Sequence, residues 1–121
     1  MFDQQNRTAR DTQRVRTEAT GSCKSMRGFE WQIKYDDLSQ GGCRVDDPRH
    51  VMELGSKVNL FIAGAGPFVA EVAWRQGDRV GLEFTNSLPD TVFEHLARGE
   101  WEEAQLASSN EVQSYPIRRV I

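Results

Sequence analysis

The sequence has no hydrophobic run long enough to cross a membrane. A helix that spans the bilayer needs about 18 consecutive apolar residues or more, and no segment of the 121 residues approaches that length. The first residues, Met1 to Arg7, also lack the apolar centre of a secretory signal peptide. We therefore expect a cytoplasmic protein without membrane insertion.

Cysteine and histidine are scarce, with two residues of each. Cys23 and Cys43 fall in segments that favour strands and form no C-x-x-C pair, so we expect two buried, reduced thiols. Neither His50 nor His95 stands in a ligand-like pattern with a cysteine or a carboxylate. Because a metal site needs several clustered ligands, we expect no metal and no cofactor.

Positive charge is not in excess either. Fifteen basic and eighteen acidic residues give a formal net charge of −3, which argues against a protein that coats nucleic acid. Gly64–Gly66 lacks the third glycine and the helix of a dinucleotide fingerprint, and no P-loop is present. The pairs Asp36–Asp37 and Asp46–Asp47 would each point to opposite faces of a strand, unlike a glycosidase dyad. These absences predict a protein that is not an enzyme.

What the chain does contain is a series of short segments with the alternation typical of β-strands. Residues 29–35 alternate without a fault, and further strands are indicated at residues 15–20, 43–45, 57–62, 68–75 and 79–84. Residues 76–78 predict a hairpin with a three-residue loop, and residues 64–67 predict a turn. Strands at this spacing, without the helices of a parallel sheet, indicate a mainly β fold, either a small barrel or a sandwich.

The apolar period changes to that of a helix after Phe84. Ser87 and Asp90 resemble a capping box, Pro89 suits a first turn, and Gly99 marks the end of the apolar stripe. This stripe consists of Leu88, Val92, Phe93, Leu96 and Ala97. Residues 100–107 can extend the helical region, with Trp101 and Ala104 on one side.

Two arginines four residues apart, Arg10 and Arg14, stand where a polar N-terminal arm meets the first strand. Arg75 and Arg79 have the same spacing but flank the predicted hairpin turn, where we expect them to face solvent. The arm can close over a ligand and the tight turn cannot, so the first pair is the candidate for binding.

A second candidate is the segment D-x-S-x-x-G at Asp37, Ser39 and Gly42, at the exit of the best-defined strand. In an extended chain Asp37 and Ser39 lie on one side, and Gly42 lets the backbone turn closely beneath a ligand. The alternative is a plain turn in which Asp37 and Ser39 bond to their own backbone.

Together the two motifs describe a site for an anionic and planar ligand, because arginine clamps phosphate and also pairs with guanine or stacks on a base. In the presence, order and separation of these motifs the chain resembles the PilZ domain, many bacterial members of which bind the second messenger cyclic di-GMP. The resemblance covers residues 10–97 and implies a six-stranded antiparallel β-barrel with a C-terminal α-helix and a flexible N-terminal arm.

The resemblance also implies roles for site residues. Arg10 and Arg14 would bind the phosphates and contact guanine, while Asp37, Ser39 and Gly42 would bind guanine and ribose-phosphate atoms.

Two further residues are candidates on the same grounds. Trp74 occupies a position near the ligand in some members, although it shares the apolar parity of Val72 and packing at the rim of the core is equally compatible. Many binding members carry another arginine directly before the first motif arginine, whereas this chain has Ala9 there and Arg7 two residues further back. The number of bound ligand molecules, one or an intercalated pair, therefore stays open.

We expect one domain, divided into an arm (1–13), a barrel (14–86), a C-terminal helix (87–107) and a tail (108–121). The expected function is that of a cyclic di-GMP receptor whose arm orders on binding and signals to a partner protein. The alternative is a PilZ-fold interaction module that binds a protein and no nucleotide. A barrel that stacks single-stranded nucleic acid on Phe29, Trp31 and Tyr35 is disfavoured, because these residues share one strand face and are more simply core.

Overall fold

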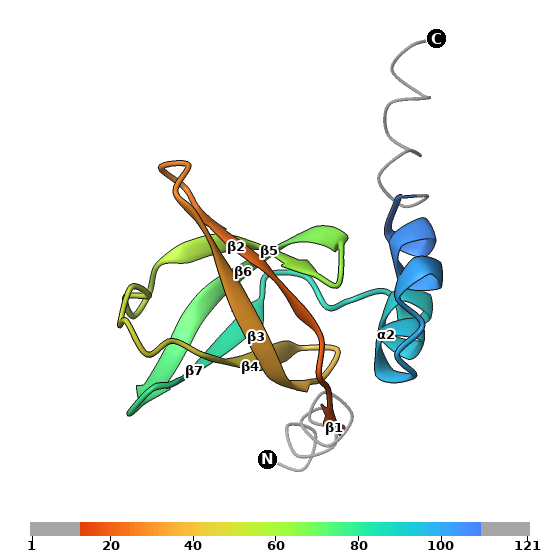
Figure 1. Cartoon of the computed structure of the whole chain (residues 1–121), viewed down its shortest axis with the longest axis horizontal. Helices are drawn as coiled ribbons and strands as arrows, with labels where there is room; N and C mark the ends of the chain where they lie inside the picture. The colour runs from red at the N-terminus through yellow and green to blue at the C-terminus, as the bar shows by residue number, and fades with distance from the viewer. Residues whose placement is uncertain (1–12, 110–121) are drawn as a thin grey trace, which may run out of the picture.

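Six antiparallel strands close into a barrel in the structure, a computed structural model that describes residues 13–109. Around the barrel the order is β3, β2, β5, β6, β7 and β4, and β4 pairs back onto β3 (Figure 1). A seventh, short strand, β1 (Val15–Arg16), pairs with the end of β3. The predicted six-stranded antiparallel barrel is confirmed. Its strands are β2 (Thr20–Ser25), β3 (Glu30–Leu38), β4 (Gly42–Asp46), β5 (Lys57–Ile62), β6 (Ala65–Gln76) and β7 (Arg79–Phe84).

The barrel interior is filled by the apolar side chains of the alternating strands. Both cysteines are buried and free, as predicted. Tyr35, also buried, satisfies its hydroxyl by donating to the carbonyl oxygen of Phe61 at 2.9 Å. Phe29 differs from the prediction, because β3 begins one residue later and the ring lies 67% exposed beside the β2–β3 turn.

Register shifts interrupt the pairing of the strands at three places, and two of these β-bulges change the exposure of the side chains that follow them. One lies in β3 between Tyr35 and Asp37, and the other lies in β6 between Val72 and Trp74. Since a bulge inserts one residue, it moves the following side chains to the other face of the sheet. Trp74, which the unbroken period places with Val72 in the core, is consequently 40% exposed.

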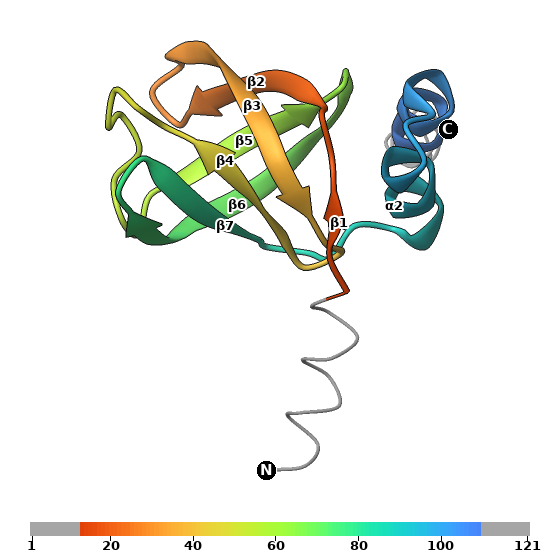
Figure 2. The same cartoon turned by 60° about the horizontal axis from the view of Figure 1, so that its bottom comes forward.

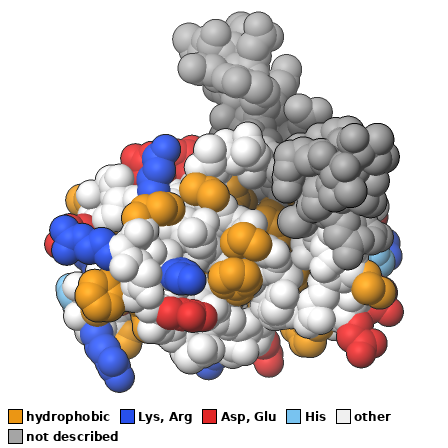
Figure 3. Space-filling view, turned by 90° about the horizontal axis from the view of Figure 1, so that it is seen from above, with side chains coloured by type: hydrophobic (Ala, Val, Ile, Leu, Met, Phe, Trp, Pro, Cys, Tyr) orange, Lys and Arg blue, Asp and Glu red, His pale blue; other side chains and the backbone are white. Residues whose placement is uncertain are grey.

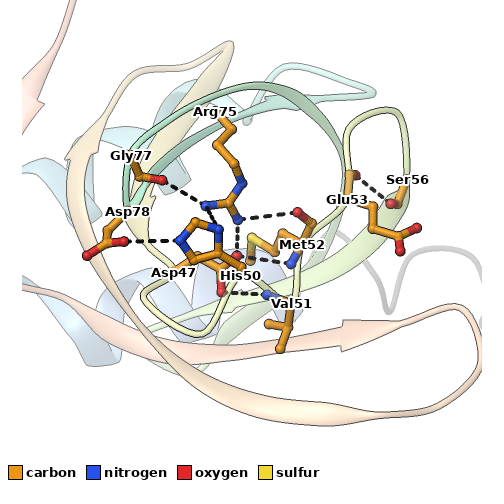
Figure 4. Close-up of polar contacts among 9 residues, drawn as sticks. All are labelled: Asp47, His50, Val51, Met52, Glu53, Ser56, Arg75, Gly77 and Asp78. Carbon is orange, nitrogen blue, oxygen red and sulfur yellow. Dashed lines mark hydrogen bonds and ion pairs between the residues drawn. The ribbon is translucent and has the colours of Figure 1, made fainter.

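The same β6 bulge turns Arg75 away from solvent, so the predicted exposure of this side chain is wrong. Its guanidinium forms an ion pair with Asp47, which is 3% exposed, and donates to the carbonyl oxygens of Gly77 at 2.9 Å and Met52 at 3.3 Å (Figure 4). Asp47 also accepts two backbone N–H groups of its own loop. Arg75 therefore fastens the loop between β4 and β5 to the β6–β7 hairpin.

Two turns are tighter than the sequence pattern predicts. Gln76 pairs with Arg79, so the hairpin loop has two residues rather than three, and Gly77 supplies the positive φ of 61° that such a turn needs. The turn after β5 consists of Ala63 and Gly64, because β6 already begins at Ala65.

The helical region stands beside the barrel, next to the point where β7 ends (Figures 1 and 2). It consists of α2 (Asp90–Ala97) and a second helical segment at residues 101–109, separated by Gly99 at a φ of 74°. Val92, Leu96 and Ala104 are buried and attach both segments to the core. The predicted capping box is wrong: the N-cap is Pro89, with no side-chain cap hydrogen bond.

The outer surface of the barrel is chemically mixed. Figure 3 shows hydrophobic, basic and acidic side chains interspersed on one face, rather than a uniformly basic one. Within residues 13–109 no helix is long and apolar enough to cross a membrane.

Candidate functional site

A cleft of about 210 Å³ opens where the end of β3, the start of β4, and strands β6 and β7 meet. It brings together four of the predicted site residues, Arg14, Ser39, Gly42 and Trp74, which come from three distant parts of the sequence. We call this space the cleft. Its remaining walls are formed by Gly41, Cys43, Ala73, Gly81, Leu82 and Glu83.

Asp37 lies beside the cleft and connects it to a group of charged side chains. The β1–β3 register pairs Arg16 with Asp37, which brings the preceding Arg14 close to this carboxylate. The Arg14 Nη1 atom lies 3.7 Å from Asp37 Oδ2, and Arg44 Nη2 lies 3.8 Å from the same oxygen. These separations exceed hydrogen-bond length, so Asp37 is surrounded by positive charge without being locked to one partner.

Asp36, Arg44 and Arg79 extend this group and were not predicted as site residues. Asp36 Oδ2 accepts from Arg44 Nε at 3.0 Å and lies 3.1 Å from Arg79 Nη1. The β3 bulge explains the arrangement, because it leaves both Asp36 and Asp37 partly exposed next to β4. Arg44 carried a sequence signal, since it alternates with the buried residues Cys43 and Val45 on a short strand.

The residues Ser39–Gly42, which we call the site turn, form a tight reversal between β3 and β4. The N–H of Ser39 donates to the carbonyl oxygen of Gly42 at 2.8 Å, and the Ser39 hydroxyl lies 3.2 Å from both backbone polar atoms of Gly42. The plain-turn interpretation thus describes Ser39. It does not describe Asp37, whose carboxylate faces Arg14 and Arg44.

Two glycines allow close packing at the floor of the cleft. A Cβ atom at Gly42 would overlap the carbonyl oxygen of Leu82, and one at Gly81 would overlap the indole of Trp74. The Trp74 ring consequently rests directly on the backbone of β7, with 40% of the residue exposed. An aromatic surface in this position can stack on a planar ligand.

The Cys43 thiol and the Arg14 guanidinium of the cleft differ in what they offer a ligand. Burial raises the pKa of the Cys43 thiol well above its usual value, so the group stays protonated and is a poor nucleophile. In the part of the chain that the structure describes, no group of three or more histidine, cysteine or acidic side chains is placed to hold a metal ion. The half-exposed Arg14 guanidinium, by contrast, carries N–H donors that suit an anion.

Two predicted site residues, Arg7 and Arg10, lie outside the described residues, as do most of the arm and of the tail. Arg14 is therefore the member of the arginine pair whose position is known.

Comparison with known families matches the part of the chain that contains these residues. The family model for the PilZ domain matches residues 8–99, a range that includes both arginines of the R-x-x-x-R motif, the site turn and α2. A search of curated proteins finds no match.

Proposed function

Because the chain belongs to the PilZ domain family, a family of cyclic di-GMP receptor and adaptor domains, we propose that it binds cyclic di-GMP in the cleft. PilZ domains are binding modules rather than catalysts, and some of them bind no nucleotide. The observation that carries the proposal is that Arg14, Ser39, Gly42 and Trp74 surround one cleft with Asp37 at its border.

Cyclic di-GMP consists of phosphates, riboses and guanines. The cleft and its border contain a side chain suited to the phosphates and side chains suited to the guanine bases. Arg14 is 48% exposed and can turn its guanidinium to a phosphate, because its pairing with Asp37 is loose at 3.7 Å. Asp37 then becomes free to accept hydrogen bonds from the N–H edge of guanine. Trp74 supplies an aromatic face on which a base can stack.

The N-terminal arm would complete the site. Arg10 precedes Arg14 by four residues, and Arg7 lies three residues before it, so phosphates held at Arg14 would attract both. Ordering of residues 1–13 against the barrel would create a new surface, and a separate protein partner would read it. Amide hydrogen exchange of residues 1–16 with and without cyclic di-GMP tests this step. Slower exchange with ligand is expected, and unchanged exchange would refute arm ordering.

Thermal unfolding tests the binding proposal itself. A ligand that binds only the folded state raises the melting temperature, and above Kd this increase grows with the logarithm of the ligand concentration. We expect an increase with cyclic di-GMP and none with equal concentrations of GTP or cyclic di-AMP. No shift with any nucleotide would favour the alternative, a PilZ module that binds a protein partner only.

A further inference from the structure

Gln40 lies inside the site turn, at one of the unspecified positions of the D-x-S-x-x-G motif. Its side-chain amide Nε2 donates to the carbonyl oxygen of Leu88 at 2.8 Å and to Asp90 Oδ1 at 2.7 Å. Both partners are acceptors, which fixes the orientation of the amide. The N–H of Leu88 in turn donates to the carbonyl oxygen of Gln40 at 2.9 Å. Three hydrogen bonds thus join one residue of the site turn to the start of α2.

These bonds anchor the start of α2, which has no side-chain cap of its own. Pro89 cannot cap the helix through a side-chain hydrogen bond, and Asp90, the acidic residue of the first turn, is bonded to Gln40 instead. The next residue of the turn, Gly41, accepts the N–H of Phe84 at 2.8 Å. The site turn is therefore held from two sides, by the end of β7 and by the start of α2.

The connection continues into the second helical segment. Glu100 donates its N–H to the carbonyl oxygen of His95 at 2.9 Å, and the two side chains lie 2.7 Å apart. Gln105 then donates to the carbonyl oxygen of Ala63 at 2.8 Å, on the barrel. The helical segments are thus bonded to the barrel at two separate points, at the site turn through Gln40 and at Ala63 through Gln105.

We propose that Gln40 is a positioning residue, which sets the geometry of the site turn and couples occupancy of the cleft to the helical unit at residues 88–109. The inference rests on the proposed function and adds a second responding element to it. Gln40 does not line the cleft, so its effect on the ligand acts through Ser39 and Gly42.

The test uses Gln40→Leu in the full chain, a change that keeps the approximate size of the side chain and removes both donors. Gln32→Leu is the matched control, because Gln32 is exposed on the outer face of β3. Asp90→Asn is the conservative variant, since it keeps an oxygen acceptor for Gln40. Amide exchange of residues 39–42 and 88–97 is measured without and with cyclic di-GMP, together with the affinity.

Without ligand, Gln40→Leu should accelerate exchange at Leu88 and in the site turn, while Gln32→Leu should not. With ligand, the wild type and Asp90→Asn should show slower exchange in α2, and Gln40→Leu should lose this response and bind at least about fivefold more weakly. If Gln40→Leu binds cyclic di-GMP as tightly as the wild type and shows the same slower exchange in α2, the positioning role of Gln40 is overturned, while the proposed function stands. Failure of the wild type to bind cyclic di-GMP would overturn the proposed function and the role of Gln40 with it.

Discussion

The guanidinium of Arg75 pairs with the carboxylate of Asp47, a side chain with only 3% of its surface exposed. The pair joins the loop between β4 and β5 to the end of β6 (Figure 4). Arg75 and Arg79 look equivalent in the sequence but differ in burial. The Arg75 side chain is 20% exposed, whereas that of Arg79 is 51% exposed.

The first prediction concerns stability. Arg75→Ala leaves a buried carboxylate without its cation and should lower the free energy of unfolding by about 3 kcal/mol. Arg79→Ala removes exposed ion pairs and should cost less than about 1 kcal/mol. Urea denaturation of both variants measures the difference. Equal losses would show that the burial of Asp47 has no energetic consequence.

The second prediction concerns the charged groups of the cleft. Arg14→Ala and Asp37→Ala should each weaken cyclic di-GMP binding about tenfold or more, because each removes a charge-assisted contact. Arg16→Ala is the matched control: it removes an exposed arginine two residues away that does not line the cleft. A loss with Arg16→Ala as large as with Arg14→Ala would place the ligand elsewhere.

The third prediction concerns stacking. Trp74→Ala should weaken binding about fivefold or more, the usual loss when a base loses its aromatic partner. Phe29→Ala removes a more exposed ring, 67% against 40% for Trp74, beside the β2–β3 turn and should leave affinity unchanged. Gly81→Ala should resemble Trp74→Ala, because the new methyl group displaces the indole. Wild-type affinity in both Trp74→Ala and Gly81→Ala would exclude stacking.

The fourth prediction concerns the thiols. Burial raises the pKa of Cys23 to about 12 from an ordinary value near 9.0. Below pH 9 the thiol is protonated in both the folded and unfolded states, so it adds no pH dependence. Between pH 9 and 12 only the unfolded state releases the proton, and stability should fall as pH rises.

Urea unfolding at pH 7.5 and pH 10.5 checks the pH dependence, with Cys23→Ala as control. That variant loses stability at both pH values by creating a cavity, but its pH difference should be smaller. Slow reaction of both thiols with Ellman's reagent at pH 8 is expected from the same burial. Rapid labelling of the native protein would contradict it.

The sequence predicts the barrel because most strands alternate regularly between buried and exposed residues, as in β5. It predicts the helix end as well, since Gly99 accepts a positive φ. The two bulges carry no such signal, because an inserted residue shifts the parity without changing the composition. This is why the sequence leaves Trp74 compatible with packing at the rim of the core. The expectation that Arg75 faces solvent comes from its place beside the hairpin turn, and the β6 bulge makes it wrong.

The candidate site was foreseeable only in part. The arginine pair and the site turn are contiguous motifs and can be found by spacing. The contacts of Gln40 with Leu88 and Asp90 join residues 48 and 50 positions apart, and the proximity of Arg44 to Asp37 depends on the β3 bulge. Long-range contacts of this kind depend on the tertiary fold. The local periodicity of the sequence therefore does not predict them.

Calorimetric titration of the full chain with cyclic di-GMP tests the central claim most directly, because one experiment gives affinity, selectivity and stoichiometry. The same titration with Arg14→Ala tests whether the ligand binds in the cleft. Titrations with GTP and cyclic di-AMP control for selectivity. We predict selective binding at about micromolar Kd or tighter, lost or strongly weakened in Arg14→Ala. Absence of heat with the wild type, together with an unshifted melting temperature, would contradict the receptor function.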